Sequence, residues 1–106
     1  LRIENRVPGA DANPYLAIAA SLACGYIGMM ETIKPSDPVE GSAYRYAHTL
    51  PLHLAEALNK LNYSKPLKQA FGERFIEAFD GVKKAEMEQY RKVISSWERE
   101  HLLLNV

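Results

Sequence analysis

The chain has 106 residues, and its 13 lysines and arginines balance its 13 aspartates and glutamates, which gives a pI near 7.0. This length allows one domain with a modest core, and the balanced charge provides no electrostatic attraction for nucleic acid or for an anionic membrane. The single cysteine, Cys24, excludes a disulfide scaffold, and its setting among alanines and glycines predicts a buried, unreactive thiol in a reducing cytoplasm.

The first seven residues alternate in character, which is the period of a β-strand. Arg2, Glu4 and Arg6 fall on one side of the predicted strand. The other side carries Leu1, Ile3, Asn5 and Val7. Pro8 and Gly9 end this pattern, so we expect a strand over residues 1–7.

An apolar helix is predicted over residues 14–31. Asn13 supplies an N-cap, and Pro14 follows it at the first helical position. Because the run is apolar on nearly every face, we expect its residues, Cys24 among them, to be buried in the intact protein. The run approaches the length of a membrane span, but its alanines, its glycines and the lack of a positive flank favour close helix packing. No membrane association is therefore expected.

The remaining residues are predicted to form a loop followed by helices. Prolines and glycines with little periodicity indicate a long loop over residues 34–52. Helical patterns follow at about 53–62, after Ser64, at about 73–93, and after a capping box of Ser95 and Glu98. Trp97 is expected to anchor the last helix in a core or in a subunit interface.

Arg2, Glu4 and Arg6 place a carboxylate between two cations on one face of the predicted strand, with neighbours about 6.6 Å apart. A divalent metal ion prefers a hard oxygen ligand such as Glu4, and phosphate groups pair well with guanidinium groups. The triplet therefore fits phosphoryl transfer. A solvated strand face with paired charges has the same pattern, so spacing alone leaves both interpretations open.

The sequence around this triplet resembles the signature of a known family. RIENRVPGADANPYLAIAASLACG is similar to the glutamine synthetase pattern, in which R-x-E-x-R is followed by P-G-A-D-A-N-P-Y-L-A and an alanine-rich helix. GERFIEAFDGVKKAEMEQY and the ending WEREHLLLNV resemble the tail of the same family. The resemblance implies that residues 1–106 are a C-terminal fragment of the catalytic domain. It also implies an α+β fold, with one active-site strand followed by a mainly helical C-terminal subdomain.

The resemblance implies a role for each residue of the triplet. Glu4 matches a ligand of one of two catalytic divalent ions, Mg²⁺ or Mn²⁺, the one that faces the phosphates of ATP. Arg6 matches the arginine that binds the substrate glutamate, and Arg2 matches an arginine assigned to phosphate. In the family reaction, the γ-carboxylate of glutamate takes the γ-phosphoryl group of ATP, and an amine then attacks the acyl phosphate.

Further implications concern the whole protein. The family forms ring-shaped homo-oligomers with active sites between neighbouring subunits, and a cytoplasmic location is expected. The other metal carboxylates and the nucleotide-binding residues are not among these 106 residues, so we expect the fragment alone to be inactive.

The amine and the catalytic status stay open. The amine is ammonia in glutamine synthetase proper, or a polyamine or other primary amine in the γ-glutamylpolyamine synthetase branch. The WEREHLLLNV ending and a loop that lacks N-L-Y-D-L-P look more like that second branch. The alternative is a non-catalytic relative that serves as a structural or interaction module, and the intact triplet weighs against it.

Other polar residues carry weaker expectations. In one bacterial branch of the family that the sequence resembles, a tyrosine in this loop is adenylylated. The surroundings of Tyr44 depart from the N-L-Y-D-L-P pattern of that branch, so this regulation is not expected. His48, His53 and His101 lack metal-ligand spacing and are interpreted as ordinary surface or core histidines.

Overall fold

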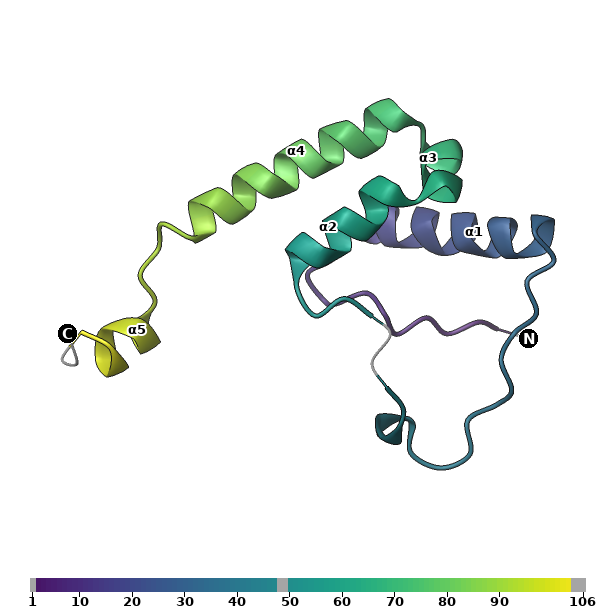
Figure 1. Ribbon diagram of the computed structural model, residues 1–106, viewed down its shortest axis with the longest axis horizontal. Coiled ribbons are helices and arrows are strands. Elements are labelled where there is room, and N and C mark those ends of the chain that lie inside the picture. The colour runs from purple at the N-terminus through teal and green to yellow at the C-terminus, as the bar shows by residue number, and fades with distance from the viewer. Residues whose placement is uncertain (1, 48–49, 104–106) are drawn as a thin grey trace.

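The structure, a computed structural model, describes residues 2–47 and 50–103 (Figure 1). These ranges contain α-helices and one short 3₁₀ helix, η1. In chain order the elements are α1 (Pro14–Met30), η1 (Ala43–Arg45), α2 (Leu54–Tyr63), α3 (Lys65–Phe71), α4 (Glu73–Tyr90) and α5 (Ser96–His101). The predicted helices are confirmed, with bounds that differ by a few residues at most. The predicted loop over residues 34–52 is confirmed where it is described, at 34–47 and 50–52, apart from the single turn of η1.

The predicted α+β fold is wrong for the described part of the chain, because residues 2–7 form no β-strand. They run as an extended segment beside α1 (Figure 1). A strand requires a ladder of backbone hydrogen bonds to a neighbouring strand, and no such partner occurs among residues 2–47 and 50–103. The alternating sequence therefore gives an extended backbone without a sheet.

The first helix begins at the predicted cap. Asn13 Oδ1 accepts hydrogen bonds from the backbone N–H groups of Tyr15 at 3.0 Å and Leu16 at 3.3 Å, and Pro14 opens the helix. No residue of α1 is buried, and Cys24 is exposed. The buried thiol expected from the sequence is thus not seen in this chain, and the burial of α1 in the intact protein stays a prediction.

The small core lies between α2 and α4. Leu58 of α2 and Ile76 of α4 are the buried hydrophobic residues of the described chain, at 3% and 1% exposure. Beside them, Asn62 Nδ2 donates to Asp80 Oδ1 at 2.9 Å, and Lys84 Nζ lies 2.7 Å from Asp80 Oδ2. The hydrogen bonds from Lys84 and then Asn62 lower the pKa of the Asp80 carboxyl. Apolar contact and a charge-assisted hydrogen bond network therefore hold these helices together.

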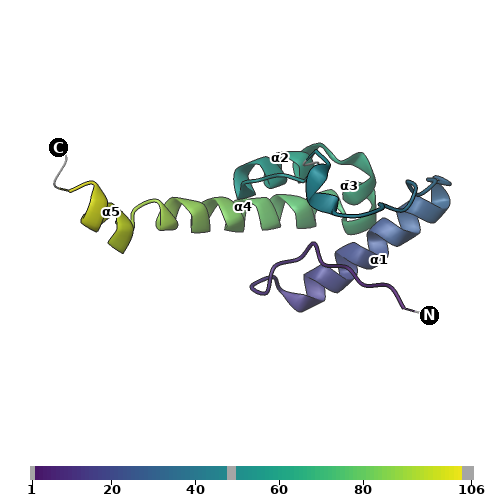
Figure 2. The same cartoon turned by 90° about the horizontal axis from the view of Figure 1, so that it is seen from below.

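The other helices extend from this core. α3 packs against α4 and also against α1. The far half of α4 leaves the core as an arm that ends in α5 (Figures 1 and 2). The molecule measures 56 × 41 × 24 Å with a radius of gyration of 17.9 Å, whereas a compact domain of this length has about 13 Å. The shape is therefore extended.

The capping box predicted for the last helix is confirmed. Ser95 Oγ accepts a hydrogen bond from the Glu98 N–H at 3.1 Å, and Glu98 Oε2 accepts one from the Ser95 N–H at 2.7 Å. The Ser95 N–H, and after it the Ser95 hydroxyl, lower the pKa of the Glu98 carboxyl. In the described part of the chain, no helix has both the length and the apolar character needed to cross a membrane.

Candidate functional site

The three charged residues predicted to carry chemistry are all exposed. Arg6 Nε donates a hydrogen bond to Glu4 Oε1 at 2.5 Å, and the two side chains are 85% and 53% exposed. An exposed ion pair of this kind stabilises a fold by about 0–1 kcal/mol. Arg2 forms no ion pair in the part of the chain that the structure describes. The structure therefore brings Glu4 and Arg6 together and leaves Arg2 apart from them.

Asn5, between the paired residues, contacts α1. Asn5 Nδ2 donates to Ser21 Oγ at 2.8 Å, and Asn5 Oδ1 accepts from the Val7 N–H at 3.1 Å. Ser21 Oγ in turn donates to the Ala17 carbonyl oxygen at 2.8 Å. The side chains thus alternate in direction as in a strand, since Asn5 bonds to the helix while Glu4 and Arg6 bond to each other.

A tight turn brings this segment back along α1. The Ala12 N–H donates to the Gly9 carbonyl oxygen at 3.1 Å, and the Asn13 cap follows immediately. A Cβ atom at residue 9 would lie 2.7 Å from Asp11 Oδ1, so any side chain there would have to displace that carboxylate. Glycine therefore suits the turn that places residue 5 beside Ser21.

The carboxylate of Glu4 has one oxygen in the ion pair and one outside it. Its Oε1 pairs with Arg6, and its Oε2 has no hydrogen bond within the described chain. An open carboxylate oxygen of this kind is a ligand that Mg²⁺ and Mn²⁺ prefer. Residues 2–47 and 50–103 contain no group of three or more His, Cys, Asp or Glu that could hold a metal ion. Glu4 therefore offers one exposed oxygen, and the described residues form no complete metal site.

The remaining sequence candidates lie away from this segment. His53 is exposed before α2, and His101 stacks on Trp97 with ring centroids 4.9 Å apart. His48 lies outside the described residues. Tyr44 is 96% exposed in η1, so its hydroxyl faces solvent.

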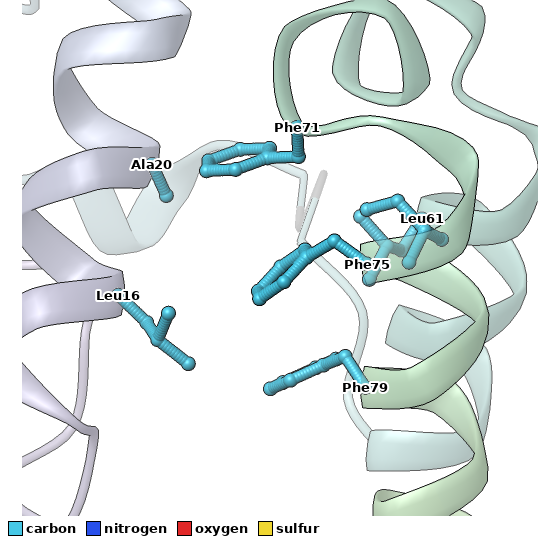
Figure 3. A pocket seen from close by; sticks show the side chains of 7 residues that line it. Leu16, Ala20, Leu61, Phe71, Phe75 and Phe79 are labelled. Carbon is cyan, nitrogen blue, oxygen red and sulfur yellow. The ribbon is translucent and has the colours of Figure 1, made fainter.

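An apolar cavity of about 110 Å³ separates α1 from α4 (Figure 3). Figure 3 shows aromatic rings of α3 and α4 facing Leu16 and Ala20 of α1. Phe75 stacks between Phe71 and Phe79, with centroid distances of 5.6 and 6.2 Å. Every lining side chain is apolar, so this cavity offers packing and no catalytic group.

Sequence reasoning missed Asn5 and Ser21, which tie the charged segment to the helix. The available signal was the polarity of Asn5 on the otherwise apolar side that carries Ile3 and Val7. On a buried apolar sheet face the amide of Asn5 would lack a hydrogen-bond partner. Beside a helix that carries a hydroxyl group, the amide has one.

The comparisons with known proteins concern the same segment and the helices after it. The model of the family described as "Glutamine synthetase, catalytic domain" matches residues 1–102. A glutamate–isopropylamine ligase of a Pseudomonas species is 40% identical over 101 residues. A gamma-glutamylethanolamide synthetase of Streptomyces coelicolor is 35% identical over 100 residues. A glutamine synthetase of Methanocaldococcus jannaschii is 32% identical over 106 residues.

These matches cover most of the chain and a small part of each relative. Each covers 92% of this chain, but only 22%, 21% and 23% of the three relatives in the order given. The chain therefore spans between a fifth and a quarter of the length of the curated relatives it matches.

Proposed function

The chain belongs to the glutamine synthetase catalytic-domain family, and on that basis we propose that the full-length protein containing it is an ATP-dependent glutamate–amine ligase. The observation that carries the proposal is the exposed Glu4–Arg6 pair, which lies within the matched residues. A carboxylate for a metal ion beside a guanidinium for an anionic substrate is what phosphoryl transfer to a carboxylate needs.

In this proposal Glu4 provides an oxygen ligand for Mg²⁺ or Mn²⁺. The ion, when bound, supplies the positive charge that offsets the charge of the ATP phosphates. Glu4 can pair with Arg6 through Oε1 and still present Oε2, so binding of the ion does not require the pair to separate. Arg2 is proposed to contact phosphate from its separate exposed position.

Arg6 is proposed to bind a carboxylate of the substrate glutamate. Its contact with Glu4 uses Nε, which leaves both Nη groups as donors. Two donors in one plane can hold both oxygens of a carboxylate. Glu4 thus holds the guanidinium group of Arg6 at Nε, and the Nη edge of the same group remains free for substrate.

The reaction proposed for the whole protein has two steps. A γ-carboxylate oxygen of glutamate attacks the γ-phosphorus of ATP, the bond to the β-phosphate oxygen breaks, and ADP leaves. The amine nitrogen then attacks the acyl carbon, phosphate leaves, and the nitrogen loses a proton to give the γ-glutamyl amide. The second step is faster than direct amide formation because phosphate is a better leaving group than hydroxide.

We further propose that the acceptor is a small primary amine. A relative with 40% identity is named for isopropylamine, and one with 35% identity is named for a γ-glutamylethanolamide. A glutamine synthetase is also 35% identical to this chain, so ammonia is kept as the alternative acceptor. A polyamine contains the same primary amine group, so the same assay tests it.

The described residues supply one metal carboxylate, which leads us to propose that they are a C-terminal part of a longer catalytic domain and are inactive alone. The full-length protein is proposed to work as a ring-shaped homo-oligomer, as in the rest of the family.

The test is phosphate release by the full-length protein with ATP, glutamate and Mg²⁺ or Mn²⁺, repeated with ammonia, isopropylamine, ethanolamine and putrescine. We expect release that depends on both glutamate and an amine, with the amide identified by mass. No release with any amine, together with no binding of ATP, would support the non-catalytic relative instead.

A further inference from the structure

One hydrogen bond joins the charged segment to the helices. Within the described chain, the bond from Asn5 Nδ2 to Ser21 Oγ, 2.8 Å long, is the only hydrogen bond between residues 2–7 and any helix. The segment has no strand ladder, and each of its described residues is exposed. Its conformation beside α1 therefore depends on this contact more than on packing.

The donors and acceptors around Asn5 form a continuous series. Ser21 donates its hydroxyl hydrogen to the Ala17 carbonyl, so the lone pairs of Oγ are free to accept from Asn5. Asn5 Oδ1 accepts from the Val7 N–H, so both ends of the amide are engaged. A flipped amide would put an NH₂ group against the Val7 N–H, which is a clash of two donors. The series thus fixes both the position and the orientation of the Asn5 side chain.

This arrangement determines where Glu4 and Arg6 lie. In an extended backbone, neighbouring side chains point to opposite sides, so holding Asn5 against α1 directs Glu4 and Arg6 away from it. There they pair with each other through Nε and Oε1. If the bond to Ser21 were lost, the segment would regain backbone freedom and the pair would spend less time in one place.

We propose that Asn5 and Ser21 are positioning residues, which hold Glu4 and Arg6 in the geometry that receives the metal ion and the substrate. The inference rests on the proposed ligase function. It assigns to α1, through Ser21, the role of holding the charged segment in place. Asn5 contacts neither metal nor substrate in this proposal, and it acts through the backbone that it shares with its neighbours.

The experiment uses the full-length protein with three variants: Asn5→Ala, Ser21→Ala and the double variant. Binding of Mn²⁺ is followed by electron paramagnetic resonance without ATP, and KM for glutamate and kcat are measured separately. We expect each single variant to bind Mn²⁺ roughly tenfold more weakly, the effect typical of groups that orient a metal ligand. The double variant should be no worse than either single variant, because both changes remove the same bond.

Two controls separate positioning from general stability. Ser21→Thr retains a hydroxyl in reach of the Ala17 carbonyl and should restore Mn²⁺ binding to within about twofold of wild type. Asn59→Ala removes an exposed asparagine of α2 that has no side-chain hydrogen bond in the described chain, and it should change nothing. Melting temperatures should stay close to wild type for all of these variants, since the bond lies at the surface.

Glu4→Ala distinguishes the two proposals. If Glu4→Ala abolishes Mn²⁺ binding while Asn5→Ala and Ser21→Ala bind normally, the positioning role is overturned and the ligase proposal stands. Additive losses in the double variant would also overturn it, because they would show two independent effects. If Glu4→Ala itself binds Mn²⁺ and turns over normally, Glu4 has no metal role and the positioning role fails with it, whereas the ligase proposal fails only if the wild-type protein releases no phosphate with any amine.

Discussion

Glu4 is a residue whose loss should affect chemistry and leave folding intact. In the full-length protein we expect Glu4→Ala to lose at least about a hundredfold in rate, the scale of removing one electrostatic contact to a transition state. Its side chain is 53% exposed and buries no core volume, so the melting temperature should hold. Steady-state kinetics with varied Mg²⁺ and a thermal melt check this. Normal turnover with unchanged metal dependence would make the pair an ordinary surface ion pair.

Arg6 should differ from Glu4 in which kinetic constant it controls. Arg6→Lys keeps the charge and the pairing with Glu4 but loses the planar fork that can hold both oxygens of a carboxylate. We therefore expect KM for glutamate to rise about tenfold or more while KM for ATP changes little. The measurement is initial rate with each substrate varied in turn. An equal rise in KM for glutamate and in KM for ATP would argue against a specific contact between Arg6 and glutamate.

Asp80 should make stability depend on pH. Lys84 and Asn62 lower its pKa in the folded state, so its stabilising effect is present above the unfolded-state pKa of about 3.9 and is lost as pH falls through the lower folded value. Asp80→Asn should therefore be less stable than wild type near pH 7, with the difference shrinking below about pH 4. Urea unfolding of both proteins between pH 3 and 7 tests this. A difference that is constant over that range would contradict it.

At the residue level, the pairing of charged side chains could be predicted from the sequence, whereas the exposure and contacts of other residues could not. The pairing of Glu4 with Arg6 was predictable, because alternate residues share a side in any extended segment. The exposure of Cys24 was not, because apolar neighbours in sequence do not reveal which surfaces another part of the chain covers. The role of Asn5 required knowing that Ser21 lies beside it.

Among the elements, α5 depends most on its cap. It has six residues, too few to be stable by propensity alone, and its capping box satisfies backbone donors at its start. We expect Ser95→Ala to destabilise this helix by about 1 kcal/mol and to speed amide hydrogen exchange within it several-fold. Exchange followed by mass spectrometry, with Ser36→Ala in the loop as a matched control, provides the check. Unchanged exchange in α5 would mean that other contacts hold it.

The helices were predictable because their start signals are local. Asn13 before Pro14, Ser64 before Lys65 and Pro66, and the Ser95 capping box all lie within one turn of the helix that they begin. A strand has no such local signal, because its backbone forms hydrogen bonds with a neighbouring strand that can be remote in sequence. The strand prediction over residues 1–7 fails at the described residues 2–7 for this reason.

For the whole molecule, the main feature is how much surface the chain exposes. It has 10145 Å² of accessible surface, whereas a compact monomer of 11.9 kDa would have about 6,000 Å². Much of the excess is apolar, including Ile18, Leu22 and Tyr26 on α1, which are 58–70% exposed. Soluble proteins rarely leave contiguous apolar surface of this kind uncovered.

The thiol of Cys24 reports whether α1 is covered in the full-length protein. We expect the thiol to react slowly with a maleimide in the native state and rapidly after denaturation, because an apolar helix is stable when its faces are packed. In this chain the thiol is exposed, so slow labelling would mean that residues outside the described ranges or a neighbouring subunit cover it. Equal rates in the native and denatured protein would show that α1 remains uncovered.

The packing of consecutive helices has a consequence for the order in which the chain folds. α2, α3 and α4 are neighbours in sequence, and α4 contacts both α2 and α3, so they can assemble through short loops within microseconds to milliseconds. The charged segment is fixed only when Asn5 reaches Ser21, which requires the turn at Gly9 and the first turns of α1 to exist already. We expect the residues proposed to carry the chemistry to reach their final positions last, on a helix that has formed before them.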